Sequence, residues 1–337
     1  MRFGIFDHLD DGGVPLGQLF EERLKLVEAY DRAGFYGYHL AEHHATPLGY
    51  APSPSVFLSA VAQRTRQLRF GPMVYLLPLY HPLRLIEEIC MLDQMSGGRF
   101  LFGVGRGISP VEVGFFGVDF AHGMQQYEEA LAVIRLWLTH DELTYHGKFY
   151  KFDAVPIVLK PAQLPHPPLW YGISRLETIP WAAENDVNLV SFLRPVSAMR
   201  PLVEQFQAEW TALRKPPDTL PRIGVTRHVV VAETEKEARN IHNTPLGYAP
   251  SPGVFLAAVA QRTRQLRFGP MVYLLPLYHP LRLIDDPGRG QAVDRAICRG
   301  GHAGLCRSLI GKIPKRIVSP FRRPRGTGGH AQPSRSP

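Results

Sequence analysis

Hydrophobic and polar positions along the first 240 residues follow two alternating patterns. Short apolar runs, typical of buried strands, are separated by longer amphipathic stretches that have the 3.6-residue period of a helix. The predicted strands are RFGIFD (2–7), GYHLAE (37–42), LRFGPMVYLL (68–77), RFLFGVG (99–105), LWYGI (169–173), VNLVSF (187–192) and IGVTRHVVVA (223–232).

Predicted helices follow these strands in turn. In the first, one face carries Leu16, Leu19, Phe20, Leu24 and Val27, and Gly34 marks the expected end. The other helices are predicted after Pro54, over about 82–95, around Tyr127, Ala130, Leu131, Ile134 and Leu138, through Trp181, and over about 197–213. The Pro-rich passage from 140 to 168 is predicted to be irregular.

This alternation predicts βαβ units, in which successive strands run parallel. Seven strands in a row, each with a helix to cover it, favour a TIM (β/α)₈ barrel in the α/β class. A doubly wound open sheet is the alternative, but no Gly-rich dinucleotide-binding fingerprint follows the first strand. We therefore expect a barrel domain over residues 1–242.

The eighth strand of that barrel is not recognisable, and a duplication stands where it should be. Residues 243–284 nearly repeat residues 45–86; within them, 46–86 and 244–284 agree at 39 of 41 positions. The two differences are Gly253 in place of Ser55 and Ala257 in place of Ser59. The second copy contains a predicted helix and strand, and is a candidate for the absent unit. We expect the eighth strand and the C-terminal helices to be missing or replaced.

The overall composition is that of a globular protein, with 45% hydrophobic and 20% charged residues. No apolar run has the length of a membrane-spanning helix, and no signal peptide opens the chain. The three cysteines (Cys90, Cys298 and Cys306) offer no disulfide framework. These features predict a cytoplasmic protein.

The formal net charge of +8 belongs to the end of the chain. Of 38 Lys and Arg and 30 Asp and Glu, residues 285–337 hold 11 and 3, which leaves 27 of each sign elsewhere. This Arg-, Gly- and Pro-rich tail is expected to be disordered. Nucleic-acid binding through it is disfavoured, because Phe321 is its single aromatic residue. We interpret the loose metal-like spacing of Cys298, His302 and Cys306 as chance and expect no metal site.

Two stretches at strand ends carry residues suited to chemistry. Glu42, His43 and His44 follow the second predicted strand, on the face where barrels of this type hold their active sites. Neighbouring residues on a strand point to opposite sides, so His43 and His44 make a poor pair of metal ligands. One of them is a candidate general acid or base, with a purely structural histidine as the alternative. Because ARNIHN precedes the second copy, this element belongs to the first copy alone.

The other candidate residues would hold a phosphate group. FGVGRG (102–107) closes the fourth strand, and its Arg106 could bind a phosphate through two parallel hydrogen bonds. GISRLET (172–178) follows the fifth strand and places Ser174 and Thr178 before a helix. Their hydroxyls suit either a phosphate site or simple helix capping.

Several of these motifs together resemble one family. DHLD, LAEHH, LPLYHPLRLIEEICMLDQMSGGRFLFGVGRG and the SRLET stretch are similar to the bacterial luciferase-like, flavin-dependent monooxygenases, over about residues 1–241. The resemblance implies a TIM barrel that binds reduced FMN supplied by a separate flavin reductase. It further implies O2 as co-substrate, a small organic substrate such as an aldehyde, and a homodimer.

The resemblance also assigns roles to individual residues. It implies that His43 is the catalytic histidine, that Arg106, Ser174 and Thr178 bind the FMN phosphate, and that Met73 and Val74 form a cis peptide bond beneath the flavin ring. Gly105 stands where luciferase α-chains have a reactive cysteine, so light emission is not implied. A deazaflavin in place of FMN, and a defective or non-catalytic flavin-binding protein with an incomplete barrel, are the alternatives.

Overall fold

The structure is a computed structural model that describes residues 2–9, 14–46, 49–173, 175–192, 196–226 and 272–275. Several expectations therefore lie outside the described residues. They concern the disordered tail at 285–337 with Cys298, His302 and Cys306, residues 227–232 of the last predicted strand, the helix predicted in the second copy, and the site residue Ser174.

The N-terminal half contains the elements expected from its periodicity, with two strands in place of the one predicted over 68–77 and with an additional short helix at Pro110–Gly114. They are β1 (Arg2–Asp7), α1 (Leu16–Ala33), β2 (Gly37–Leu40), α2 (Pro54–Arg64), β3 (Arg69–Pro72), β4 (Tyr75–Leu76), α3 (Pro82–Ser96), β5 (Phe102–Gly105), α4 (Pro110–Gly114) and α5 (Gly123–Thr139). The structure confirms helix α1: Leu19 and Val27 of the predicted face are buried, whereas Leu16 at its start is exposed. The helix ends at Gly34, whose φ of 79° lies in the left-handed region that favours glycine.

The second half continues the alternation after a hairpin. Its elements are β6 (Glu142–His146), β7 (Lys151–Pro156), β8 (Leu169–Gly172), α6 (Ile179–Glu184), β9 (Asn188–Ser191), α7 (Val196–Ala212), β10 (Ile223–Val225) and β11 (Val272–Leu275). Three short 3-10 turns lie at Leu77–Leu79, Leu176–Thr178 and Pro217–Thr219.

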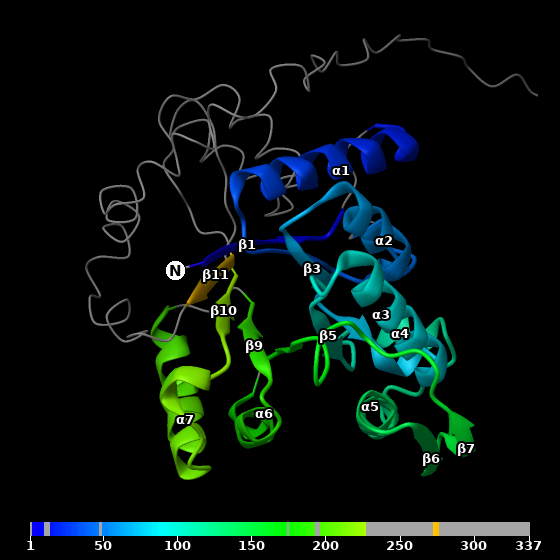
Figure 1. The fold of residues 1–337 in the computed structure, drawn as a ribbon, viewed down its shortest axis with the longest axis vertical. Helices are drawn as coiled ribbons and strands as arrows, with labels where there is room; N and C mark the ends of the chain where they lie inside the picture. Colours follow the sequence, from blue (N-terminus) through cyan, green and yellow to red (C-terminus); the bar gives the residue numbers. More distant parts are fainter. Residues whose placement is uncertain are drawn as a thin grey trace, which may run out of the picture.

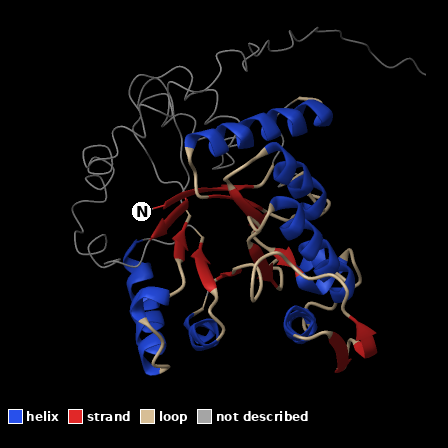
Figure 2. Ribbon diagram, in the orientation of Figure 1, coloured by secondary structure: helices blue, strands red, loops and turns tan. Residues whose placement is uncertain are grey.

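The strands form one large sheet with the order β3-β2-β1-β11-β10-β9-β8-β5-β4. All neighbours pair in parallel except β11, which runs antiparallel to both β1 and β10. The two ends of this order, β3 and β4, are consecutive segments of the chain. The helices lie outside the strands (Figures 1 and 2). This arrangement confirms the α/β class and the parallel βαβ units.

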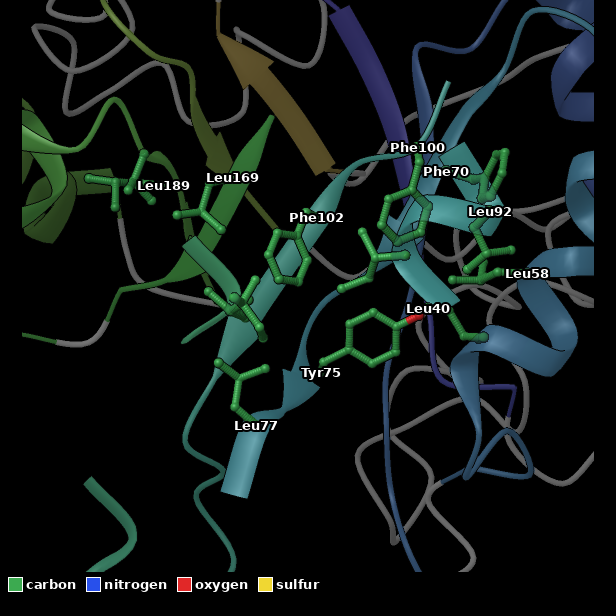
Figure 3. Packing of buried hydrophobic residues seen from close by; sticks show 14 of the residues in the cluster. Leu40, Leu58, Phe70, Tyr75, Leu77, Leu92, Phe100, Phe102, Leu169 and Leu189 are labelled. Atoms are coloured by element: carbon green, nitrogen blue, oxygen red, sulfur yellow. The ribbon is translucent and has the colours of Figure 1, made fainter. Parts of the chain in front are cut away.

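The main core fills the space between strands and helices. Phe70 and Phe100 meet edge to face with ring centroids 5.9 Å apart, and Tyr75 lies near Phe102 (Figure 3). Each large apolar side chain removed from water in this way contributes about 1.5–3 kcal/mol before the cost of ordering it. A smaller cluster of Met73, Leu101, Trp170 and Val190 forms a second buried group.

Two sequence predictions were wrong in detail. The strand expected over 68–77 is interrupted between β3 and β4, where the Met73–Val74 peptide bond is cis. The passage over 140–168, expected to be irregular, contains the antiparallel hairpin β6–β7. This hairpin is exposed along most of its length, so it lacks the apolar alternation that reveals a half-buried strand.

Within the described segments, no helix combines the length and the apolar character needed to cross a bilayer. The same segments contain no group of three or more His, Cys, Asp or Glu side chains placed to hold a metal ion.

Candidate functional site

The predicted site residues follow the carboxyl ends of parallel strands. His43 comes after β2, Met73 and Val74 lie between β3 and β4, Arg106 follows β5, and Thr178 follows β8. Because neighbouring strands in this sheet are parallel, these ends lie at the same edge, where α/β proteins bind their ligands.

His43 is held by a carboxylate that the sequence did not identify. Its Nδ1 lies 3.3 Å from Oε2 of Glu112, and the same carboxylate accepts a hydrogen bond of 2.9 Å from the backbone N–H of His44. Glu112 is only 4% exposed. A neutral His43 with its proton on Nδ1 would donate to Glu112 and leave Nε2 as an acceptor. The side chain could therefore take up or return a proton at Nε2.

Glu112 reaches this place through the short helix α4. Ser109 precedes the helix, and its hydroxyl oxygen accepts from the backbone N–H of Glu112 at 3.2 Å. The spacing Ser-x-x-Glu is a local signal for a helix start, and it could have located α4 in the sequence. Nothing in that spacing indicates that the carboxylate would turn towards His43, which is 69 positions away.

His44 pairs with a different carboxylate. Its Nε2 lies 2.8 Å from Oε1 of Glu42, while Oε2 of Glu42 accepts from the backbone N–H of Leu76 at 3.1 Å. Burial raises the pKa of Glu42, and the hydrogen bond with His44 opposes that rise. The two adjacent histidines thus serve separate contacts. Glu42 and His44 tie the end of β2 to β4, whereas His43 turns to Glu112.

Gly105 and Val74 pack so closely that any Cβ atom at position 105 would force the Val74 side chain to shift. A Cβ atom on Gly105 would lie 2.4 Å from Cγ2 of Val74, well inside van der Waals contact. The resemblance implied a cis peptide bond at Met73–Val74, and the structure contains it. The glycine that replaces the cysteine of luciferase α-chains therefore has a local steric reason in this chain.

Arg106 has the surroundings of an anion-binding residue. Its guanidinium lies over the Phe120 ring, 4.4 Å from the centroid. Burial raises the pKa of Tyr171, while the positive charges of Arg106 and Arg175 lower it, so both guanidinium groups act on that hydroxyl. In the described part of the chain, neither arginine has a carboxylate within ion-pairing distance. Two cations without a paired carboxylate fit the phosphate group of a flavin nucleotide. Arg175 is a further candidate that sequence reasoning missed.

Thr178 has a local role in the structure. Its hydroxyl donates to the backbone carbonyl of Arg175 at 2.7 Å, and its side chain makes no capping hydrogen bond to α6. The described contacts therefore join Thr178 to Arg175 and do not join it to Arg106. The phosphate role of Thr178 stays a prediction.

Comparison with known proteins places the chain in a family. A family model described as luciferase-like monooxygenase matches residues 1–246. The chain belongs to the luciferase-like monooxygenase family. An uncharacterized protein, y4wF, of Sinorhizobium fredii is 45% identical over 241 residues, which make up 72% of this chain and 70% of that protein.

Named relatives within this luciferase-like family are flavin-dependent monooxygenases. The oxygenase component of flavin-dependent trigonelline monooxygenase from Acinetobacter baylyi is 28% identical over 246 residues, 71% of this chain and 67% of that protein. The solved structure of the oxygenating constituent of 3,6-diketocamphane monooxygenase from Pseudomonas putida, in complex with FMN, has a TM-score of 0.65 at 23% identity. That match covers 78% of this chain and 76% of the other and supports the shared fold.

Proposed function

We propose that this luciferase-like protein is a flavin-dependent monooxygenase. It takes reduced FMN from a separate flavin reductase and uses O2 to oxidise a small organic substrate, with aldehydes as the first class to test. The observation that carries this proposal is the pairing of His43 with the buried Glu112 carboxylate, at the same sheet edge as Arg106, which has no carboxylate partner among the described residues.

Each residue has a separate part in the proposed reaction. The flavin, when bound, activates O2; the chain supplies binding, orientation and proton handling. Arg106 and Arg175 bind the phosphate group, with Ser174 and Thr178 as further hydroxyl contacts. Met73 and Val74 would lie beneath the ring system of the bound flavin. His43 holds or accepts a proton at Nε2, while Glu112 fixes the ring through Nδ1.

A relative of this chain supports the use of a flavin, and the histidine element favours FMN over a deazaflavin. The trigonelline monooxygenase relative is named as flavin-dependent and as an oxygenase component, which supports a separate reductase partner. The Glu42-His43-His44 element that the resemblance associates with the luciferase branch has both histidines engaged by carboxylates.

Closing the gap between β1 and β10 requires a further strand, and we propose that the second copy supplies it as β11. The pairings Phe3 with Tyr273 and Gly224 with Leu274 support this assignment. An antiparallel β11 would cover the two edges that would otherwise expose unpaired backbone groups.

Anaerobic titration with reduced FMN tests the function directly. Arg106→Ala should weaken binding about tenfold or more, because a charge-assisted phosphate contact contributes about 1.5–3 kcal/mol. The matched control is Arg84→Ala, which removes an exposed arginine paired with Glu88 on α3 and should leave affinity unchanged. Binding that is absent, or equal in wild type and Arg106→Ala, would contradict the phosphate assignment.

Activity is the second step of the test. Reductase-coupled O2 consumption with candidate aldehydes should need the flavin, and His43→Gln should lower turnover while flavin affinity stays near wild type. Flavin binding without any substrate-dependent O2 use across the screen would favour the non-catalytic alternative.

A further inference from the structure

A second imidazole lies directly against His43. The ring of His8, which follows β1, is stacked on the His43 ring with centroids 5.4 Å apart and an angle of 22° between the planes. His8 also meets the Phe6 ring edge-on, with centroids 4.8 Å apart. The half-buried His8 ring thus contacts both an apolar neighbour and the histidine proposed for proton transfer.

Contacts of Asp7, the last residue of β1, hold the backbone around His8 in place. Oδ1 of Asp7 accepts the backbone N–H of Leu9 at 3.0 Å, and Oδ2 accepts the Tyr38 hydroxyl at 2.7 Å. Arg23 forms an ion pair of 3.0 Å with the same carboxylate, and both partners are buried. These contacts satisfy the Asp7 charge and hold the turn that carries His8 in one position.

Residues of the first copy of the duplicated segment also contact this turn. The backbone N–H of Tyr50 donates to the carbonyl of Leu9 at 2.9 Å. A Cβ atom on Gly49 would lie 2.6 Å from the His8 carbonyl oxygen and 3.6 Å from Cβ of His43. The absence of a side chain at position 49 therefore lets the segments after β1 and β2 approach until the two rings stack.

Charged groups around this pair act in opposite directions. Glu112, on α4, lies against Nδ1 of His43 and favours a positive charge on that ring. A proton on His8 disfavours a positive charge on His43, because two like charges would then be stacked. Among the described residues near this pair, Glu42 is paired with His44 and Asp7 with Arg23.

We propose that His8 is a positioning residue for His43, which fixes the plane of that ring by stacking and, through its own charge, keeps His43 available to accept a proton at Nε2. This inference rests on the proposed function for its catalytic meaning. The two rings behave as a coupled pair, in which protonation of one makes protonation of the other less favourable.

NMR titration of the His43 ring in the full chain tests the coupling without any flavin. The ring carbon–proton signal of His43, assigned by its loss in His43→Gln, is followed with pH in wild type and in His8→Phe, which keeps an aromatic ring and removes the second charge. In His8→Phe, the midpoint of the His43 titration should move to higher pH by about half a unit. The reason is that repulsion between two unit charges 5.4 Å apart in water corresponds to a midpoint shift of about 0.6 pH units.

The matched control is His122→Phe, at an exposed histidine paired with Asp119. It should leave the His43 transition at its wild-type pH. His8→Gln is the second variant in case His8→Phe does not fold, and it should give the same upward shift. A His43 transition that stays in place, or moves down, in the folded His8 variant would overturn the proposal.

Turnover connects the pair to the reaction. In reductase-coupled O2 consumption, His8→Phe should move the pH profile in the same direction as the NMR transition, and a profile that stays with wild type would overturn the link to catalysis. If the wild-type chain binds no reduced FMN, the proposed function fails, whereas the NMR result still decides whether the two histidines are coupled.

Discussion

The sequence VYLL occurs at 74–77 and again at 272–275, and the two occurrences pair differently. In the first, Tyr75 and Leu76 form β4 and run parallel to β5, with Tyr75 opposite Val104. In the second, the four residues form β11 and run antiparallel to β1 and β10, with Tyr273 opposite both Phe3 and Val225. The Tyr-Leu pair is therefore extended in both places, whereas the neighbouring strands select its direction and partners.

The two serines of the first copy that are replaced in the second make different kinds of contact, one between elements and one within a helix. Ser55 Oγ lies 2.8 Å from the buried Tyr75 hydroxyl and so links α2 to β4. Ser59 donates to the carbonyl of Val56 within the same helix, at an exposed position. Gly253 and Ala257, in their places, have no hydroxyl group that could form either bond. In the first copy, both hydroxyls have partners.

The largest expected difference between the two copies is in the stability effect of replacing Gly71. A Cβ atom there would lie 1.8 Å from the carbonyl oxygen of Leu101, so Gly71→Ala should lower the free energy of unfolding by more than about 3 kcal/mol or prevent folding. Gly269→Ala, the same change in the second copy, should have a smaller effect, because Gly71 already occupies the place beside Leu101. Urea unfolding of both variants measures the difference. Equal losses would show that the two copies are equally constrained.

A second, smaller effect is the pH dependence of stability that arises from His39 in β2, the strand that precedes the first copy and whose sequence does not recur before the second. Burial lowers the pKa of His39 to about 4. Below pH 6.5 the unfolded chain binds the proton and the folded chain does not, so the free energy of unfolding should fall by about 1.4 kcal/mol per pH unit between 6.5 and 4. His39→Leu should flatten this fall in urea unfolding at pH 7, 6 and 5. The exposed His81→Leu should follow wild type, and a His39→Leu curve as steep as wild type would contradict the assignment.

The smallest effects come from making the first copy resemble the second. Ser55→Gly should lower the free energy of unfolding by about 1–2 kcal/mol, since it leaves the Tyr75 hydroxyl without this partner and places glycine in a helix. Ser59→Ala should change it by less than about 0.5 kcal/mol. Thermal unfolding of the two variants side by side gives the comparison. A Ser59→Ala loss as large as that of Ser55→Gly would mean that the tertiary link carries no special weight.

Sequence reasoning located most elements and the candidate site edge, but it missed the groups that act on that site. Apolar spacing predicted α1 and α3 within one residue of their observed ends, because burial of one helix face leaves a local period. The hairpin β6–β7 leaves no such period. Glu112 and His8 also escaped detection, since their contacts with His43 depend on how α4 and the turn after β1 pack.

The sequence by itself determined the strand–helix alternation, the α/β class, the family, and the placing of His43 and Arg106 after parallel strands. These features follow from local periodicity and from motifs that are contiguous in the chain. Only the tertiary structure decided that Glu112 meets Nδ1 of His43, that His8 stacks on the same ring, and that identical VYLL segments pair in opposite directions. Such contacts depend on which distant surfaces meet when the core packs, and no short stretch of sequence contains that information.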